Sequence, residues 1–233
     1  MNNQFQKHKE LILNVFKKHY SECKKNEMKK IFLILTLILT TNLTKAQTET
    51  DTMKTALILI DIQNDYFKGG KMELSEPKKA GEKAQLILEN FRNKKMPVIH
   101  IQHLSTRPNS TFFIPNTFGA EIHESVKPNE NEKVITKNYP NSFRETDLLE
   151  YLKKIGVEKL VINGMMTHMC VDATTRAAKD FGFECVVISD ACATKNLEIN
   201  NETVKAEEVQ KAFLGALNYY YSTVLTSEKF LTE

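Results

Sequence analysis

Short apolar runs alternate with longer amphipathic stretches over most of this chain. The apolar runs have the length of buried strands and lie at 55–60, 98–102, 133–136, 159–163, 184–189 and 222–226. Stretches with helical spacing separate them, at 78–95, 145–155, 169–181 and 203–220. This alternation predicts an α/β fold of three layers, α/β/α, with Rossmann-like topology. A mostly parallel central sheet of about six strands would be covered by helices on both faces.

Turn-forming residues agree with these boundaries. Gly156 and Gly182 follow two of the predicted helices as C-terminal stops, and Pro97 follows a third. The segment 104–132 has no clear periodicity, so we expect loops and short helices that cover one end of the sheet. The pattern as a whole predicts one domain over residues 54–230 with a sizeable core.

Residues 28–46 are organised like an export signal. Two basic residues, Lys29 and Lys30, precede an apolar core at 31–39, and a small-residue segment ends at Ala46. The apolar core is short for a bilayer span, which takes about 20 residues. We therefore predict a cleaved signal peptide and an exported protein, periplasmic or secreted, without stable membrane insertion of the mature domain. An uncleaved signal anchor is the alternative.

The segment before this signal, residues 1–27, has no evident role. We interpret it as an upstream extension and expect translation to start at Met28. The alternative is a short amphipathic helix, whose apolar face would comprise Leu11, Ile12, Val15 and Phe16.

Most of the positive charge belongs to the leader. The whole chain has 32 basic and 29 acidic residues. Without the nine Lys and three Glu of residues 1–46, the mature chain keeps 23 basic and 26 acidic residues, a net charge of −3. No basic patch with interleaved aromatics remains, so the sequence predicts no nucleic-acid partner.

Three polar residues lie where the predicted strands end. Cys170 falls in the turn between the strand at 159–163 and the next helix, where a helix N-terminus would favour the thiolate. Asp61 follows the strand at 55–60, and Lys137 follows the strand at 133–136. In open α/β sheets the carboxyl ends of the strands face one ligand-binding crevice. An acid, an ammonium and a thiol are therefore expected to converge there, although each alone has an inert interpretation in packing, capping or a solvated loop.

The motifs around these three residues resemble those of the isochorismatase-like cysteine hydrolases, which include nicotinamidases and N-carbamoyl amidases. The resemblance covers Lys54 to Phe230. It rests on three segments and their downstream continuation: LIDIQND at 59–65, VITK at 134–137 with Ser142-Phe143, GMMTHMCV at 164–171, and TTRAA at 174–178 with VISDACA at 187–193. Three motifs in the right order at plausible intervals make the match specific.

The resemblance implies a chemistry that the three residues would also perform unaided. Cys170 would attack a carbonyl carbon, Asp61 would act as general acid and base, and Lys137 would support both electrostatically. The resemblance also implies a cis peptide at Met165–Met166 and an oxyanion hole formed by the N–H groups of Met166 and Cys170. It implies no cofactor, a small-molecule substrate and a homo-oligomer.

A metal site is expected to be absent. Nicotinamidases of this family bind a divalent metal with residues after the second strand, where this chain has His100 and His103. A spacing of three on a strand sends these two side chains to opposite faces, so a shared metal is hard to build. The alternative is a local helical turn that brings them together, with His123 as a third ligand.

The substrate is less well defined by the sequence. Aromatic residues in the cover and near the motifs predict an apolar pocket with a few polar groups. The candidate pocket residues are Gln63, Tyr66, Phe67, His103, Phe143 and Thr167. Family members that hydrolyse the vinyl ether of isochorismate need an acid more than a thiol, so retention of Cys170 favours C–N bond cleavage. Nicotinamidase or isochorismatase activity is the alternative within the class, and a catalytically silent binding protein is the alternative outside it.

Four cysteines are present, and Cys23 would be lost with the leader. Cys185 and Cys192 flank one predicted strand, and their separation of about 23 Å when extended is too large for a disulfide. We therefore expect three unpaired thiols in the mature protein.

Overall fold

The computed structural model describes residues 17–18 and 53–232. The expected upstream extension (1–27) and signal peptide (28–46) lie outside the described residues, apart from the pair 17–18. Residues from Met53 onward form one compact unit. In that unit no helix combines the length and apolar character needed to cross a membrane.

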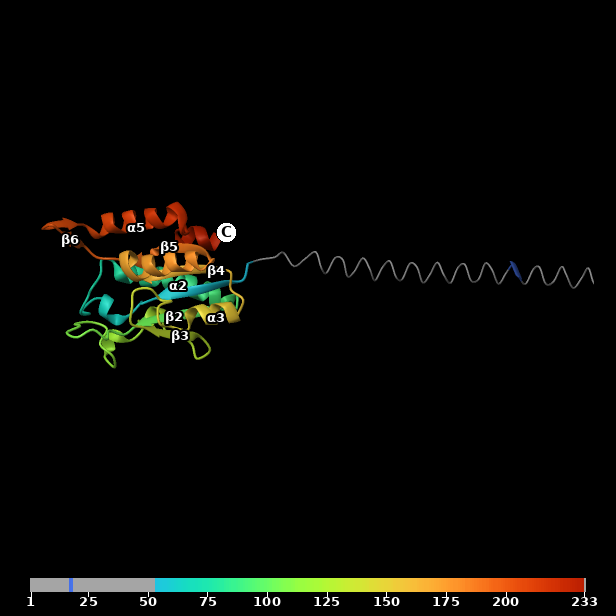
Figure 1. Ribbon diagram of the computed structural model, residues 1–233, viewed down its shortest axis with the longest axis horizontal. Helices are drawn as coiled ribbons and strands as arrows, with labels where there is room; N and C mark the ends of the chain where they lie inside the picture. The colour runs from blue at the N-terminus through green and yellow to red at the C-terminus, as the bar shows by residue number, and fades with distance from the viewer. Residues whose placement is uncertain (1–16, 19–52, 233) are drawn as a thin grey trace, which may run out of the picture. The chain divides into compact units, whose positions relative to one another are not determined.

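The centre of the domain is a six-stranded sheet in the order β3-β2-β1-β4-β5-β8, and every neighbouring pair is parallel (Figure 1). Its strands are β1 Thr55–Ile60, β2 Val98–His103, β3 Lys133–Lys137, β4 Lys159–Met165, β5 Glu184–Ala193 and β8 Thr223–Leu225. A separate antiparallel hairpin pairs β6 Leu197–Ile199 with β7 Glu202–Val204. The predicted six-stranded parallel sheet is thus confirmed.

Helices cover both faces of this sheet (Figure 1). They are α2 Pro77–Asn93, α3 Leu148–Lys154, α4 Asp172–Asp180, α5 Ala206–Tyr220 and α6 Ser227–Thr232. Short 3-10 turns, η1 Asn64–Tyr66, η2 Phe118–Ala120 and η3 Glu124–Val126, and a π-helical turn, η4 Thr167–Val171, complete the chain. The two glycine stops have positive φ, 68° at Gly156 and 92° at Gly182, a conformation that disfavours other residues.

Alternating side chains on the strands build a core on each face. On β1, Leu57 and Leu59 join α2 and α6 on one face. Ala56, Ile58 and Ile60 join α3, α4 and α5 on the other face. All five are at most 2% exposed, as a strand buried on both faces requires.

The structure differs from the sequence prediction at three elements. The hairpin β6–β7 and the short helix α6 were not predicted, because strands of three residues and a helix of six residues are too short to show a clear periodic pattern. The helix expected from residue 169 is preceded by the π-helical turn η4, and α4 proper begins at Asp172. The cover at 104–132 contains only loops and the short turns η2 and η3, as expected.

Candidate active site

The three candidate residues lie at the carboxyl ends of the strands. Asp61 directly follows β1, Lys137 is the last residue of β3, and Cys170 lies in η4 directly after β4. The parallel sheet delivers all three to one edge, and their exposed fractions are 0%, 1% and 4%.

The Lys137 ammonium stands at the centre of this group. Its Nζ lies 2.7 Å from Asp61 Oδ2, 3.0 Å from His103 Nδ1 and 3.4 Å from Cys170 Sγ. An ammonium has three donors, so this geometry uses all of them. Burial alone would lower the pKa of Lys137, but the charge of Asp61 and the contacts with Asp61 and Cys170 together outweigh burial and raise that pKa, which keeps the group cationic.

The two carboxylate oxygens of Asp61 differ in their hydrogen bonding. Its Oδ2 accepts from Lys137, whereas its Oδ1 is buried without a hydrogen-bond partner. The residue has a left-handed backbone, φ 50°, a region that is uncommon for non-glycine residues but several-fold enriched in Asp. A buried carboxylate oxygen with no partner is costly, and it is positioned to receive a proton.

Cys170 differs from the expectation of a thiolate favoured by a helix N-terminus. Burial is the largest influence and raises the pKa of the Cys170 thiol. The charge of Asp61 raises it further, and Lys137 opposes the shift only in part. The sulfur lies in the π-helical turn η4, the first turn of the helical run that continues as α4, and burial outweighs the effect of that helix terminus. The resting sulfur is therefore a thiol whose proton needs an acceptor.

The backbone beside Cys170 is held by a close approach of two strands. The Met165–Met166 peptide is cis, at the position that the resemblance implies. Gly164, which precedes it, has φ 135°, and a Cβ at this position would collide with the carbonyl oxygen of Ile60, next to Asp61. The oxyanion hole of the Met166 and Cys170 amides stays a prediction.

His103 is brought to the catalytic group by β2. Its pKa is lowered to about 4 by burial first and then by the charge of Lys137, so the ring is neutral at pH 7. Since the ammonium can only donate, His103 Nδ1 accepts and the ring proton lies on Nε2.

Three of these residues, Asp61, His103 and Cys170, also have the spacing of metal ligands. Ligand atoms of Asp61, His103 and Cys170 lie within 4.8 Å of one another, a spacing that suits a cation. Lys137 Nζ already lies within hydrogen-bond distance of all three, so the cation that they surround is the lysine ammonium itself. His100 and His103 point to opposite faces, as expected, because His100 Nε2 contacts Glu132 instead, at 2.9 Å.

The structure brings two of the remaining candidate pocket residues, Tyr66 and His103, to this crevice. The Tyr66 ring packs edge-on against Phe113 with centroids 4.6 Å apart, and His103 lies 5.8 Å from the same ring. Both Tyr66 and Phe113 are at most 2% exposed. They form an aromatic wall between the cover loop and the catalytic group.

The polar groups of Gln63 and Thr167 already form hydrogen bonds within the protein. The Gln63 side chain accepts from the His103 N–H at 2.7 Å and donates to the carbonyls of His103 and Ala120. The Thr167 hydroxyl lies 2.7 Å from Gln210 Oε1. These residues therefore hold the walls of the crevice in place.

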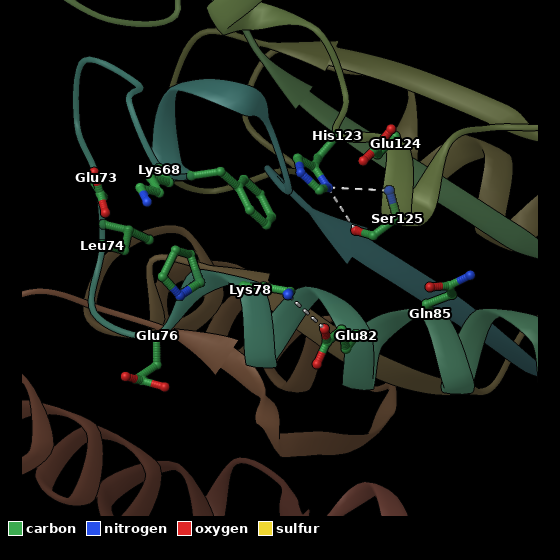
Figure 2. A pocket seen from close by; sticks show the side chains of 12 residues that line it. Lys68, Glu73, Leu74, Glu76, Lys78, Glu82, Gln85, His123, Glu124 and Ser125 are labelled. Atoms are coloured by element: carbon green, nitrogen blue, oxygen red, sulfur yellow. Dashed lines mark hydrogen bonds and ion pairs between the residues drawn. The ribbon is translucent and has the colours of Figure 1, made fainter.

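Phe143 and Phe67 pack away from the catalytic atoms. Phe143 contacts the buried Phe183 and the half-exposed Phe181. Phe67 stacks on His123 with centroids 3.5 Å apart. That pair lines a cavity of about 800 Å³ at the start of α2, which none of the three catalytic candidates borders (Figure 2).

The polar groups of this cavity are largely satisfied locally. Figure 2 shows His123 bound to Ser125 through the backbone N–H and the hydroxyl of that serine. On α2, Lys78 pairs with Glu82 one helical turn away, at 3.8 Å (Figure 2). Because its charged side chains are exposed and pair with one another, we assign this cavity no ligand.

One functional residue was missed from the sequence. Asp65 stands out in the sequence only as the last residue of the motif at 59–65, but in the structure it is 5% exposed and lies beneath the cover. Its carboxylate accepts from the backbone N–H of Phe113 at 2.6 Å and of Lys71 at 3.2 Å. It thus fixes the loop that carries the aromatic wall. A lone Asp in a polar loop offered no signal of this role.

A parallel α/β sheet with Asp61, Lys137 and Cys170 meeting at the ends of its strands is typical of a cysteine hydrolase. The comparison with family models gives the same class, since residues 55–229 match the Isochorismatase domain. The chain belongs to the isochorismatase family.

Individual relatives cover the described domain almost completely. The isochorismatase family protein YddQ of Bacillus subtilis is 54% identical over 179 residues, which are 77% of this chain and 99% of that protein. The secreted isochorismatase effector Isc1 of Verticillium dahliae is 31% identical over 76% of this chain and 90% of its own length. The crystal structure of a putative isochorismatase hydrolase from Oleispira antarctica has 46% identity and a TM-score of 0.75, covering 77% of this chain and 97% of that one. These likenesses support the predicted fold class and family.

Proposed function

We propose that this protein hydrolyses an amide-like C–N bond of a small molecule through a thioester on Cys170. The proposal rests mainly on the different surroundings of the two carboxylate oxygens of Asp61. Lys137 binds one carboxylate oxygen and the sulfur, while the other carboxylate oxygen stays buried and unpartnered. A protonated thiol beside a free carboxylate oxygen is the arrangement that general-base activation of a nucleophile needs.

The reaction follows from this geometry in two halves. In the first, Cys170 Sγ bonds to the substrate carbonyl carbon while its proton passes to Asp61, and the π electrons move to the carbonyl oxygen. The tetrahedral species then breaks its C–N bond, and the leaving nitrogen takes the proton from Asp61. In the second half, water loses a proton to Asp61 and attacks the thioester. The C–S bond breaks, and the sulfur recovers the proton.

Lys137 serves both halves without exchanging a proton. Its charge stabilises the thiolate as it develops and holds the Asp61 carboxyl group in place through the contact with Oδ2. Cys170 also favours an amide over a vinyl ether, because ether hydrolysis needs an acid and gains nothing from a thiol.

A hydrolysis screen tests the proposal. Purified full-length protein is offered primary amides, ureides, nicotinamide and isochorismate, and the released amine, ammonia or pyruvate is measured. We expect turnover of an amide or ureide, at least 10³-fold lower in Cys170→Ala and nearly as low in Asp61→Asn. A Cys170→Ala protein as active as the wild type would overturn the proposal. If every substrate fails, the catalytically silent binding protein becomes the better reading.

We also propose that the protein is exported after cleavage of the signal at 28–46. Support comes from the leader pattern and from Isc1, a relative whose name describes it as secreted. N-terminal sequencing of the protein from a fractionated expression host should find a mature end near Gln47 outside the cytoplasm. A cytoplasmic protein that retains residues 28–46 would refute export.

A homo-oligomer is the further expectation of the resemblance, and the proposed partner is the small-molecule substrate alone. Light scattering of the purified full-length protein checks the first point, since a mass equal to one chain at micromolar concentration would contradict it.

A further inference from the structure

Two mostly buried side chains beside Cys170 carry polar groups that the protein does not use. They are the hydroxyl of Tyr66 and the Nε2–H of His103. Among the described residues neither group has a hydrogen-bond partner. Some polar atoms of the described residues are fully buried without a hydrogen-bond partner, Asp61 Oδ1 and His100 Nδ1 among them. Tyr66 Oη and His103 Nε2 do not belong to that group. Each of these two atoms therefore keeps some solvent-accessible surface, although Tyr66 as a whole is only 2% exposed.

Both groups carry a proton at neutral pH and can donate it in a hydrogen bond. His103 Nδ1 accepts from Lys137, which fixes the proton on Nε2 at the far side of the ring. Burial, followed by negative charge at Cys170 and Asp61, raises the pKa of the Tyr66 hydroxyl, so its proton stays in place. The two rings pack on the same side chain, Phe113, which fixes their positions.

The buried cation of the site cannot take over this role. All three donors of Lys137 are directed at Asp61, His103 and Cys170. A substrate that binds against the aromatic wall would therefore contact two neutral donors, the Tyr66 hydroxyl and the His103 Nε2–H. A purely apolar ligand would leave both donors without a hydrogen bond.

We propose that Tyr66 Oη–H and His103 Nε2–H recognise the substrate by donating hydrogen bonds to acceptor atoms outside the scissile carbonyl. The inference rests on the proposed function and narrows its substrate class. The preferred substrates are aromatic or apolar amides and ureides that carry a further neutral acceptor, such as a ring nitrogen or a second carbonyl.

Reversible aldehyde binding tests this without requiring turnover. An aldehyde forms a thiohemiacetal: the Cys170 sulfur bonds to the carbonyl carbon, and the thiol proton ends on the oxygen. The probes are benzaldehyde and the three pyridinecarboxaldehydes, which differ by one ring acceptor. The readout is protection of Cys170 in the full-length protein against iodoacetamide, measured by peptide mass spectrometry. Each value is divided by the affinity of the same aldehyde for glutathione, which removes its intrinsic reactivity.

We expect at least one pyridine isomer to protect about three- to tenfold better than benzaldehyde after this correction, the effect of one ordinary hydrogen bond. Tyr66→Phe and His103→Asn should each reduce that advantage. Tyr66→Phe keeps the ring against Phe113, and the Asn oxygen can still accept from Lys137. The control is Tyr219→Phe, which removes a hydroxyl from a tyrosine that is 91% exposed and should change nothing.

Equal protection by all four aldehydes, or an advantage untouched by both variants, overturns the inference and leaves the proposed function intact. Failure of every aldehyde to protect Cys170 overturns both. A second readout needs no ligand: nitrogen chemical shifts of His103, assigned with the Asn variant, should show a neutral ring protonated on Nε2 from pH 5 to 8. A proton on Nδ1, or titration near 6.5, would contradict the proposed donor.

Discussion

At the scale of residues, the catalytic group is held together by one buried ammonium with three acceptors. Asp61, His103 and Cys170 come from three different parts of the chain, and each is oriented by its contact with Lys137. The surroundings keep the His103 ring neutral and raise the pKa of the Cys170 thiol. The sulfur therefore develops its charge only during the reaction.

The protonation state of Cys170 can be measured by alkylation. Since burial and Asp61 raise the pKa of this thiol, its alkylation rate should keep rising with pH beyond the ordinary value of ~8.5. Asp61→Asn removes one of the two causes and should lower the apparent pKa while abolishing catalysis. Cys185 and Cys192, which burial gives pKa values of about 12, are internal controls in the same digest. A wild-type pKa below 8.5 would mean a resting thiolate paired with Lys137 instead.

Lys137→Met should cost stability as well as activity. It leaves the Asp61 carboxylate buried without its partner, which destabilises a protein by about 3–5 kcal/mol. Urea unfolding at neutral pH measures this, and the double variant Lys137→Met/Asp61→Asn should regain much of the stability but none of the activity. The matched control is Lys133→Met on the same strand, whose partner Asp147 is 54% exposed, with an expected change below about 1 kcal/mol. Equal effects of the two lysine variants would contradict this account of Lys137.

At the scale of elements, the ends of the strands position the catalytic candidates, and the cover loop at 104–132 contributes the aromatic wall beside them. The strands were predictable because unbroken apolar runs of four to six residues, such as 55–60, have few other interpretations. Asp61, Lys137 and Cys170 could be predicted as a group because each follows the end of such a run. The residues that line the pocket were harder to predict. Tyr66 lies at the catalytic group whereas Phe67 and Phe143 do not, and this difference depends on tertiary contacts that the sequence does not show. Burial of the turn that carries Cys170, which raises the pKa of its thiol, is likewise a tertiary property that the sequence does not show.

Asp65 gives a test of the cover loop. Asp65→Ala leaves two backbone N–H groups without an acceptor, one of them at the aromatic wall, and should cost about 2–3 kcal/mol. We expect faster limited proteolysis within 105–120 and a higher KM, with Cys170 alkylation nearly unchanged. Glu73→Ala is the matched control, because Glu73 accepts from the Gly69 N–H at an exposed site of the same region. Wild-type proteolysis and KM in Asp65→Ala would show that the loop is held by other contacts.

At the scale of the whole domain, an ionic network away from the active site ties a helix to two strands. Glu132, just before β3, accepts from Arg92 of α2 at 2.7 and 2.8 Å and contacts His100 of β2. Burial raises the pKa of Glu132, but the bonds from Arg92 and from the Asn129 backbone outweigh it and lower that pKa to about 2. This network couples the packing of α2 to the sheet edge that carries Lys137.

The pH dependence of unfolding tests that network. Because the pKa of Glu132 is depressed in the folded state, its contribution to stability is complete above about pH 4.5 and is lost as pH falls toward 2. Glu132→Gln should be less stable by about 2–3 kcal/mol at pH 7 and should lose less stability over that acid range. Glu207→Gln, in an exposed pair on α5, is the control and should follow the wild-type curve. Parallel curves for Glu132→Gln and wild type would refute the assignment.

The thioester on Cys170 is the central claim, and rapid-quench mass spectrometry with the best amide of the screen tests it most directly. The account predicts a transient mass increase equal to the acyl group, located on the peptide that contains Cys170 and absent in Cys170→Ala. Full turnover with no adduct on Cys170, or an adduct elsewhere that tracks the rate, would contradict it.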